Sequence, residues 1–229
     1  MTAHAKAALL IGSPKGSQSN SLSIGAYLAS RLKTCGIDTT EFFVHQSLRS
    51  QPAIDSLLVA ACSADILIVS FPLYVDCLPA GLIQGLDIIA ARRCMEPPLK
   101  KPLFLAVCNS GFPEPQHSHV AIEICRSFAR KAAFTWAGGL PIGGGAAIRG
   151  RPLDRAGGMF SNIRAALDLT AKSLADGGNV PRKALTLLSK PPVPAWLYTF
   201  VGSLGWRLRA LANKSHKYLR ARPYDEQHP

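Results

Sequence analysis

The first stretch that could do chemistry follows an apolar run near the start of the chain. Residues 8–32 read ALLIGSPKGSQSNSLSIGAYLASRL. The apolar run stops at Gly12, a polar segment rich in Ser and Gly follows, and an apolar pattern with helical spacing then begins. A strand that leads through such a loop into a helix can bind an anion, because the first helical amides lack partners and carry the positive end of the helix dipole. We therefore predict an anion-binding loop here.

The residue types in this loop supply hydrogen-bond donors and one positive charge. The candidate donors are Ser13, Lys15, Ser17, Ser19, Asn20 and Ser21. The spacing is not that of a P-loop, because its two glycines, Gly12 and Gly16, are four apart, and the dinucleotide fingerprint Gly-x-Gly-x-x-Gly is also missing. An ordinary helix start capped by Ser or Asn, with no ligand, is the alternative interpretation.

Two further loops have the same relation to an apolar run. Residues 71–81 read FPLYVDCLPAG and residues 108–117 read CNSGFPEPQH, and each holds an aromatic residue, a proline and polar groups. Each follows a segment that we predict to be a strand. Because the carboxyl ends of parallel strands meet at one edge of a doubly wound sheet, we expect the three loops to converge there.

Five short apolar runs must position these loops. We predict strands over residues 6–11, 39–43, 65–70, 102–107 and 133–137. Longer segments with helical patterning lie between them, and this alternation indicates a parallel sheet with helices on both faces. The 39–43 run is more polar and is placed at an edge of the sheet. A glycine-rich loop is expected after Ala137, followed by a helix from about Met159 to Ala175.

Over roughly residues 6–178, the three loops resemble those of the flavodoxin-like, NAD(P)H-dependent FMN reductases. The resemblance implies an α/β fold: a flavodoxin-like, doubly wound five-stranded parallel sheet of order 2-1-3-4-5 with a C-terminal helical tail. In that family the first loop holds the FMN phosphate, and the other two contact the isoalloxazine ring. The FMN contacts implied here are Ser13, Lys15, Ser17, Ser19, Asn20 and Ser21 in the first loop, Pro72, Leu73, Tyr74 and Val75 in the second, and Asn109, Ser110, Gly111 and Phe112 in the third.

The resemblance implies an enzyme in which bound FMN passes hydride from NAD(P)H to a quinone, free flavin or similar small acceptor. It requires no catalytic side chain. The six cysteines have no spacing typical of zinc or iron–sulfur sites, so no metal is expected. Two other functions stay open. One is a flavodoxin-type electron carrier without a nicotinamide site, although such carriers are usually acidic and this chain has a net charge of +12. The other is a non-catalytic relative whose tail mediates assembly.

The end of the chain differs in character from the rest. We expect an FMN-binding domain over residues 1–180 and a basic, proline-led helical tail over residues 181–229. From Gly177 onward there are nine Lys/Arg and two acidic residues, a net +7. An apolar stripe recurs at helical spacing in the tail and needs a partner, because contiguous apolar surface is rarely left exposed. Its members are Leu197, Val201, Leu204, Leu208 and Leu211.

We expect this stripe to dock on a second copy of the chain, giving a homo-oligomer. Packing on its own domain and binding to an anionic membrane surface are the weaker alternatives. The sequence contains no helix-turn-helix, zinc-finger or RNA-binding aromatic motif, so no nucleic-acid partner is expected. The first ten residues, MTAHAKAALL, lack the pattern of a secretory leader, so we expect a cytoplasmic protein.

Overall fold

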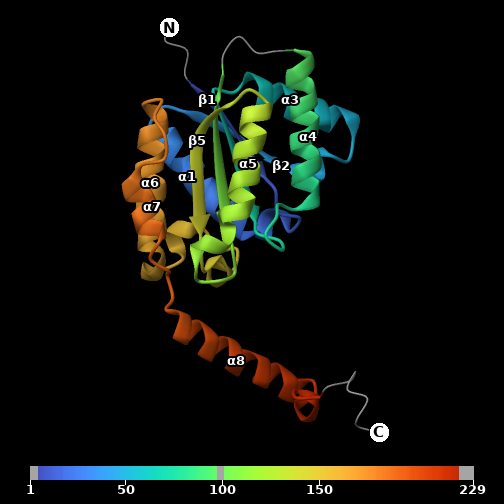
Figure 1. Ribbon diagram of the computed structural model, residues 1–229, viewed down its shortest axis with the longest axis vertical. Coiled ribbons are helices and arrows are strands. Elements are labelled where there is room, and N and C mark those ends of the chain that lie inside the picture. The colour runs from blue at the N-terminus through green and yellow to red at the C-terminus, as the bar shows by residue number, and fades with distance from the viewer. Residues whose placement is uncertain (1–4, 97–100, 222–229) are drawn as a thin grey trace. The chain divides into compact units, whose positions relative to one another are not determined.

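Five parallel strands form one sheet in the computed structural model, which describes residues 5–96 and 101–221. The strands run in the order β2-β1-β3-β4-β5 (Figure 1). Their bounds are β1 Lys6–Ile11, β2 Asp38–Phe43, β3 Ile66–Pro72, β4 Leu103–Asn109 and β5 Thr135–Ile142. The predicted five-stranded parallel sheet and its order are therefore confirmed, and the more polar β2 lies at an edge.

Successive side chains of the central strands enter two separate cores. In β1, Leu9 and Ile11 point to one face of the sheet, whereas Ala8 and Leu10 point to the other, and none of them is more than 1% exposed. This two-residue period, with both faces covered, explains why the strand is a continuous apolar run.

Helices cover both faces of the sheet. On one face lie α1, α6 and α7, and on the other lie α3, α4 and α5 (Figure 1). The bounds of the helices are α1 Asn20–Thr34, α2 Val44–Ser47, α3 Gln51–Ser63, α4 Ala80–Met95, α5 His119–Lys131, α6 Ser161–Ala175, α7 Arg182–Leu188 and α8 Ala195–Ala212.

The last strand corrects one prediction. The glycine-rich loop was expected to start after Ala137, but β5 continues to Ile142 and pairs with β4 as far as Asn109. The two glycines in this strand serve close packing. A Cβ added at Gly138 would lie 2.5 Å from Val180 Cγ2, and one added at Gly139 would clash with Ile122 Cγ2. Here glycine therefore admits neighbouring elements rather than breaking the strand.

The chain divides into two compact units, Met1–Pro192 and Val193–Pro229. The first unit includes α7, whose Ala184 and Leu188 are buried in the core with α6 and the sheet. We predicted the division after residue 180, whereas the structure divides the chain after Pro192, twelve residues later. The described part of the second unit, up to residue 221, contains α8 and the short 3-10 helix η6, His216–Tyr218.

Among the helices within residues 5–96 and 101–221, none has the length and apolar character needed to cross a membrane.

Candidate functional site

The first loop turns the chain tightly between β1 and α1. Gly12 N donates to Ser70 O at 2.9 Å, which fixes the start of the loop against β3. Gly16 has a φ of +56°, in the left-handed region that favours glycine, and it opens a short 3-10 helix. Ser19 ends the loop as the N-cap of α1, because its Oγ accepts from Leu22 N at 3.1 Å. The amino end of α1 therefore adjoins the loop.

Two amides of this loop are left over for a ligand. The N–H groups of Ser13 and Ser17 have no hydrogen-bond partner in the part of the chain that the structure describes. The first amides of α1 have no acceptor within their own helix, and the positive end of the helix dipole lies beside them. The side chain of Ser13 is buried, whereas Lys15 and Ser17 are open to solvent. Free amides, hydroxyls and an accessible cation together suit a phosphate group.

Three of the predicted first-loop residues also hold neighbouring segments in place. Ser19 caps α1. Asn20 Oδ1 accepts from Gly150 N at 2.7 Å, which ties the loop to the segment after β5. Ser21 Oγ accepts from Asn109 Nδ2 at 2.9 Å. The capping by Ser19 matches the helix start that the sequence offered as an alternative, whereas the contacts of Asn20 and Ser21 were not predicted.

The second and third predicted loops begin side by side. Asn109, the last residue of β4, is the register partner of Pro72, the last residue of β3, and Leu73 N donates to Asn109 O at 2.8 Å. The Asn109 side chain donates to Ser21 Oγ and also to Phe71 O, each at 2.9 Å. All three loops therefore meet at the carboxyl edge of the sheet. The buried side chain of Asn109, in the third loop, contacts the other two.

The second loop is a tight turn with an exposed tip. Tyr74 and Cys77 exchange backbone hydrogen bonds of 2.9 and 3.0 Å, and Val75 and Asp76 between them have φ values of +47° and +59°. This conformation is unusual for the β-branched Val75, whose side chain is 98% exposed. Tyr74 is 43% exposed, so both side chains are accessible to a ligand at this edge.

Backbone hydrogen bonds hold the third loop against the end of β5 and the segment that follows it. Ser110 N donates to Ile142 O, Gly145 N donates to Ser110 O at 2.8 Å, and Gly144 N donates to Phe112 O at 2.6 Å. The amides of Gly111 and Phe112 have no partner within the described residues, and the Phe112 ring is 54% exposed. The loop therefore presents two free donors and an aromatic ring.

No protein-family model and no curated protein sequence matches the chain. Solved structures do match it. An NADH:FMN oxidoreductase in its apo form superposes with a TM-score of 0.55 at 14% identity, covering 83% of this chain and 96% of its own. An NAD(P)H:quinone oxidoreductase from Methanothermobacter marburgensis gives a TM-score of 0.54 at 13% identity, covering 76% and 95%. An NADPH-quinone reductase from P. pentosaceus gives 0.51 at 13% identity, covering 75% and 97%.

These superpositions and the strand order decide the fold. The chain has a flavodoxin-like fold. The resemblance noted in the sequence is thereby confirmed for the fold. In a flavodoxin-like fold the ligand site is expected where the strand order reverses, between β1 and β3. The first two loops follow those two strands, and Asn109 joins the third to them.

The flavodoxin-like fold of this chain also has a cavity of about 350 Å³ beside the first loop. Its lining includes Ser17, Tyr27, Arg31, Gly150 and Asp154, and none of the predicted residues of the second and third loops. The cavity therefore borders the predicted phosphate loop but does not coincide with the predicted ring site.

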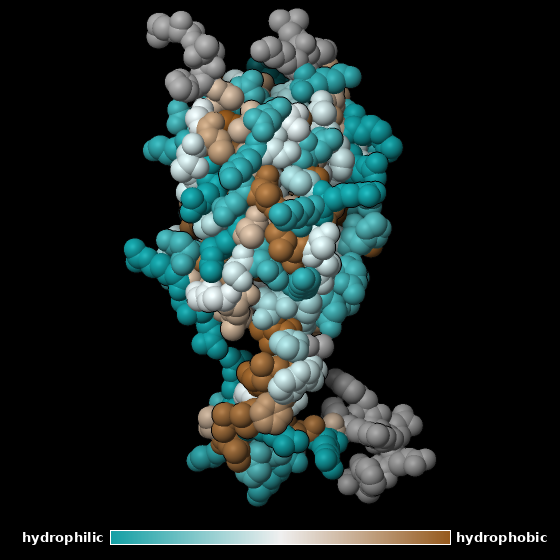
Figure 2. Space-filling view, turned by 90° about the vertical axis from the view of Figure 1, so that its left-hand side faces the viewer, coloured by the Kyte–Doolittle hydropathy of each residue, from teal (hydrophilic) through white to brown (hydrophobic). Residues whose placement is uncertain are grey.

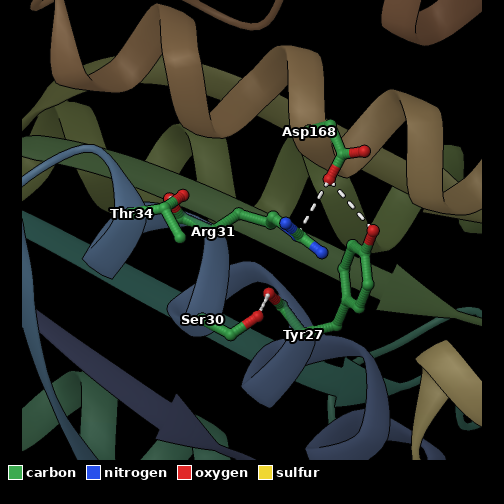
Figure 3. A network of polar contacts seen from close by, with 5 residues as sticks. All are labelled: Tyr27, Ser30, Arg31, Thr34 and Asp168. Carbon is green, nitrogen blue, oxygen red and sulfur yellow. Dashed lines mark hydrogen bonds and ion pairs between the residues drawn. The ribbon is translucent and has the colours of Figure 1, made fainter.

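A polar network joins α1 to α6 at this cavity (Figure 3). Tyr27 donates its hydroxyl to Asp168 Oδ1 at 3.0 Å, and Arg31 Nε forms an ion pair with the same oxygen at 3.3 Å. The Arg31 guanidinium also lies 5.0 Å from the centre of the Tyr27 ring. Burial and, to a lesser degree, the Asp168 contact raise the pKa of Tyr27, so its hydroxyl stays a donor at neutral pH.

The sequence missed two parts of the site's surroundings. His45 follows β2, and a Cβ added at Gly16 would lie 3.4 Å from its Cε1, so the imidazole borders the first loop. Its Nδ1 is buried with no hydrogen-bond partner among the described residues. The other part is the segment 143–150, which holds both the third loop and Asn20. The position of His45, two residues after the end of the predicted strand 39–43, was the available signal.

Proposed function

We propose that the chain is an FMN-dependent oxidoreductase that transfers electrons from NAD(P)H to a small acceptor such as a quinone or free flavin. The observation that carries this proposal is the set of free amides and hydroxyls at the start of α1, which Asn109 joins to the other two loops. FMN has a phosphate at one end and a polar ring at the other. The free donors of the first loop suit the phosphate, and those of the third loop suit the polar edge of the ring. The fold shared with an NADH:FMN oxidoreductase adds support.

The phosphate of FMN would be held at the first loop. The amides of Ser13 and Ser17, their hydroxyls and the first amides of α1 would donate to its oxygens, and Lys15 would offset part of its charge. Hydrogen bonds to a charged group are the strong ones, worth about 1.5–3 kcal/mol each. The remaining first-loop residues, Ser19, Asn20 and Ser21, would keep the loop in shape through their own contacts.

The ring would lie against the second and third loops. The exposed aromatic rings of Tyr74 and Phe112 offer apolar surface, while Pro72, Leu73 and Val75 belong to the same turn. The free amides of Gly111 and Phe112 would donate to the polar edge of the ring, and Ser110 and Asn109 would hold those amides in place. Donors at that edge favour additional negative charge on it.

FMN supplies the redox chemistry when it is bound. The part played by the chain is to bind the phosphate, orient the ring and leave one ring face open to NAD(P)H and then to the acceptor. We assign no side chain as a general acid or base, because the predicted contacts need none.

A titration and an assay test this proposal. Protein stripped of flavin should quench FMN fluorescence on binding, and anaerobic NADH or NADPH should then remove the visible flavin absorbance, which a quinone should restore. Binding of FMN without reduction by either nicotinamide would favour the electron carrier. Failure to bind FMN would refute the proposal altogether.

A further inference from the structure

The second unit carries an apolar surface that its own residues leave open. Six large side chains of α8 are 49–70% exposed: Trp196, Phe200, Val201, Leu204, Leu208 and Leu211. At 3.6 residues per turn they fall within an arc of about 140° around the helix, which also contains Leu197 and, near its edge, Arg207. We call these six residues the apolar arc. Figure 2 shows the brown, hydrophobic side chains gathered over this helix.

The short helix η6 borders one edge of this arc without covering it, because His216 and Lys217 line a cavity with Leu211. Ser215 N donates to Ala210 O at 2.8 Å, and Ala210, which lies beyond the edge of the arc, is 6% exposed. The turn after α8 therefore covers another side of the helix. The apolar arc is left without a cover among the described residues of its own unit, and such a contiguous surface marks a site of interaction.

The described residues of this unit, 193–221, carry charged side chains of a single sign. Residues 193–221 include five Lys/Arg and no Asp or Glu. The basic residues are Arg207, Arg209, Lys214, Lys217 and Arg220. An amphipathic helix with Trp and Leu on one side and basic residues beside them is typical of peptides that lie in the interface of an anionic membrane.

A basic cavity opens beside the apolar arc. It has a volume of about 420 Å³ and is lined by Arg207, Leu211, His216, Lys217, Leu219 and Arg220. Two leucines and four basic side chains form this lining, which includes no acidic residue. Leu211 also belongs to the apolar arc, so the cavity joins a cationic surface to an apolar one. An anionic group attached to an apolar chain matches both.

We propose that the second unit binds an anionic phospholipid surface. The side chains of the apolar arc enter the boundary between headgroups and acyl chains, and the basic cavity holds a headgroup phosphate. This proposal is independent of the proposed redox function, because none of its residues belongs to the flavin site.

Charge decides between this partner and a second copy of the chain, which the sequence alone favoured. Residues 193–229 carry six Lys/Arg and two acidic residues, a net +4, so residues 1–192 carry the remaining +8 of the total +12. Docking of the tail on another copy is therefore opposed by the like net charge of the two parts, whereas an anionic bilayer attracts the tail.

Sedimentation of the full-length protein with vesicles tests the proposal. The protein should pellet with phosphatidylcholine vesicles that contain phosphatidylglycerol, stay in the supernatant with phosphatidylcholine alone, and be released by high salt. Leu204→Glu, at the centre of the apolar arc, and the pair Lys217→Glu/Arg220→Glu, in the basic cavity, should each weaken binding at least tenfold.

Matched controls separate this surface from bulk properties. Val59→Glu replaces an apolar residue of the first unit that is 69% exposed, and Lys33→Glu/Arg49→Glu makes the same change in charge at exposed positions of that unit. Both should bind vesicles as the parent does. Equal losses in the controls, or no dependence on anionic lipid, would overturn the proposal. So would a full-length oligomer that Leu204→Glu converts to monomer while neither form sediments with vesicles.

Discussion

Asn109, at the end of β4, donates its side-chain amide to Ser21 Oγ in the first turn of α1 at a distance of 2.9 Å. The same nitrogen donates to Phe71 O in β3, also at 2.9 Å. One side chain that is 5% exposed therefore connects the three loops on which the proposed flavin site depends.

Replacing this residue should damage both stability and the site. Asn109→Ala removes two buried side-chain hydrogen bonds, to Phe71 O and to Ser21 Oγ, so the free energy of unfolding should fall by about 1–3 kcal/mol. FMN affinity should fall as well, because the loops lose their link. Chemical denaturation and FMN titration measure the two effects, with Asn162→Ala on α6 as the control. Parent-like stability and affinity in Asn109→Ala would show that this link is not needed.

The first loop should recognise the phosphate rather than the ring. Ser13→Ala/Ser17→Ala removes two hydroxyls while leaving the backbone amides, and FMN affinity should fall at least tenfold, since hydrogen bonds to a charged group contribute about 1.5–3 kcal/mol each. Riboflavin lacks the phosphate, so its affinity should be unchanged in the same variant. Equal losses for FMN and riboflavin, measured by fluorescence quenching, would place the ring at this loop instead.

A close approach beneath the third loop should make Gly143 irreplaceable. A Cβ added there would lie within contact distance of the Pro113 carbonyl, whereas one added at Gly158 would meet nothing within 4 Å, and neither glycine has a positive φ. Gly143→Ala must therefore displace the backbone of the third loop and should destabilise the fold by about 1–3 kcal/mol. Gly158→Ala should leave the melting temperature close to that of the parent. If the two variants melt together, the loop is not held as the structure has it.

Buried thiols should make the fold sensitive to high pH. Burial raises the pKa of Cys108 from 9.0 to about 12, and burial also raises that of Cys125. Above pH 9 the unfolded chain loses thiol protons that the folded chain keeps, so stability should fall as pH rises from 9 towards 12. The slope should be about 1.4 kcal/mol per pH unit for each thiol.

Variants isolate this contribution from other groups that titrate at high pH. Denaturation at about pH 7 and pH 10 should show a smaller loss for Cys125→Ala than for the parent, because one of the two thiols is gone. Cys94→Ala, at an exposed position, should lose as much as the parent does. An unchanged loss in Cys125→Ala would contradict the assignment.

The sheet could be predicted from the sequence because its central strands are short continuous apolar runs. Lys6–Ile11 was predicted with its observed bounds, since both its faces are covered. The end of β5 was missed because Gly138 and Gly139 have the composition of a loop. Their close contacts with Val180 and Ile122, and the φ of +135° at Gly138, explain why glycine stands in this strand. Contacts between segments far apart in sequence do not appear in local periodicity.

The residue types of the site could be predicted from the sequence. Which of these residues hold the loops in place and which are free to bind a ligand could not. Ser13 and Asn20 looked equivalent in the sequence, whereas the structure engages Asn20 with Gly150, 130 residues away, and leaves the Ser13 amide free. This difference depends on which distant segment of the chain packs against the loop. The turn at Tyr74 was likewise recognised as a loop, but the left-handed conformation of Val75 carries no local signal, because β-branched residues rarely adopt it.

The contact between Tyr27 and Asp168 joins α1, which is made early in synthesis, to α6, which is made late. The core under β1 is closed by α1, near the start of the chain, and by α6, which ends at Ala175. A nascent chain that has made β1 to β4 therefore still exposes the apolar side of those strands until α6 leaves the ribosome, at a synthesis rate of about 5–20 residues per second. Part of one face of the sheet is therefore covered only near the end of translation of the first unit, and its apolar side chains stay open during that interval.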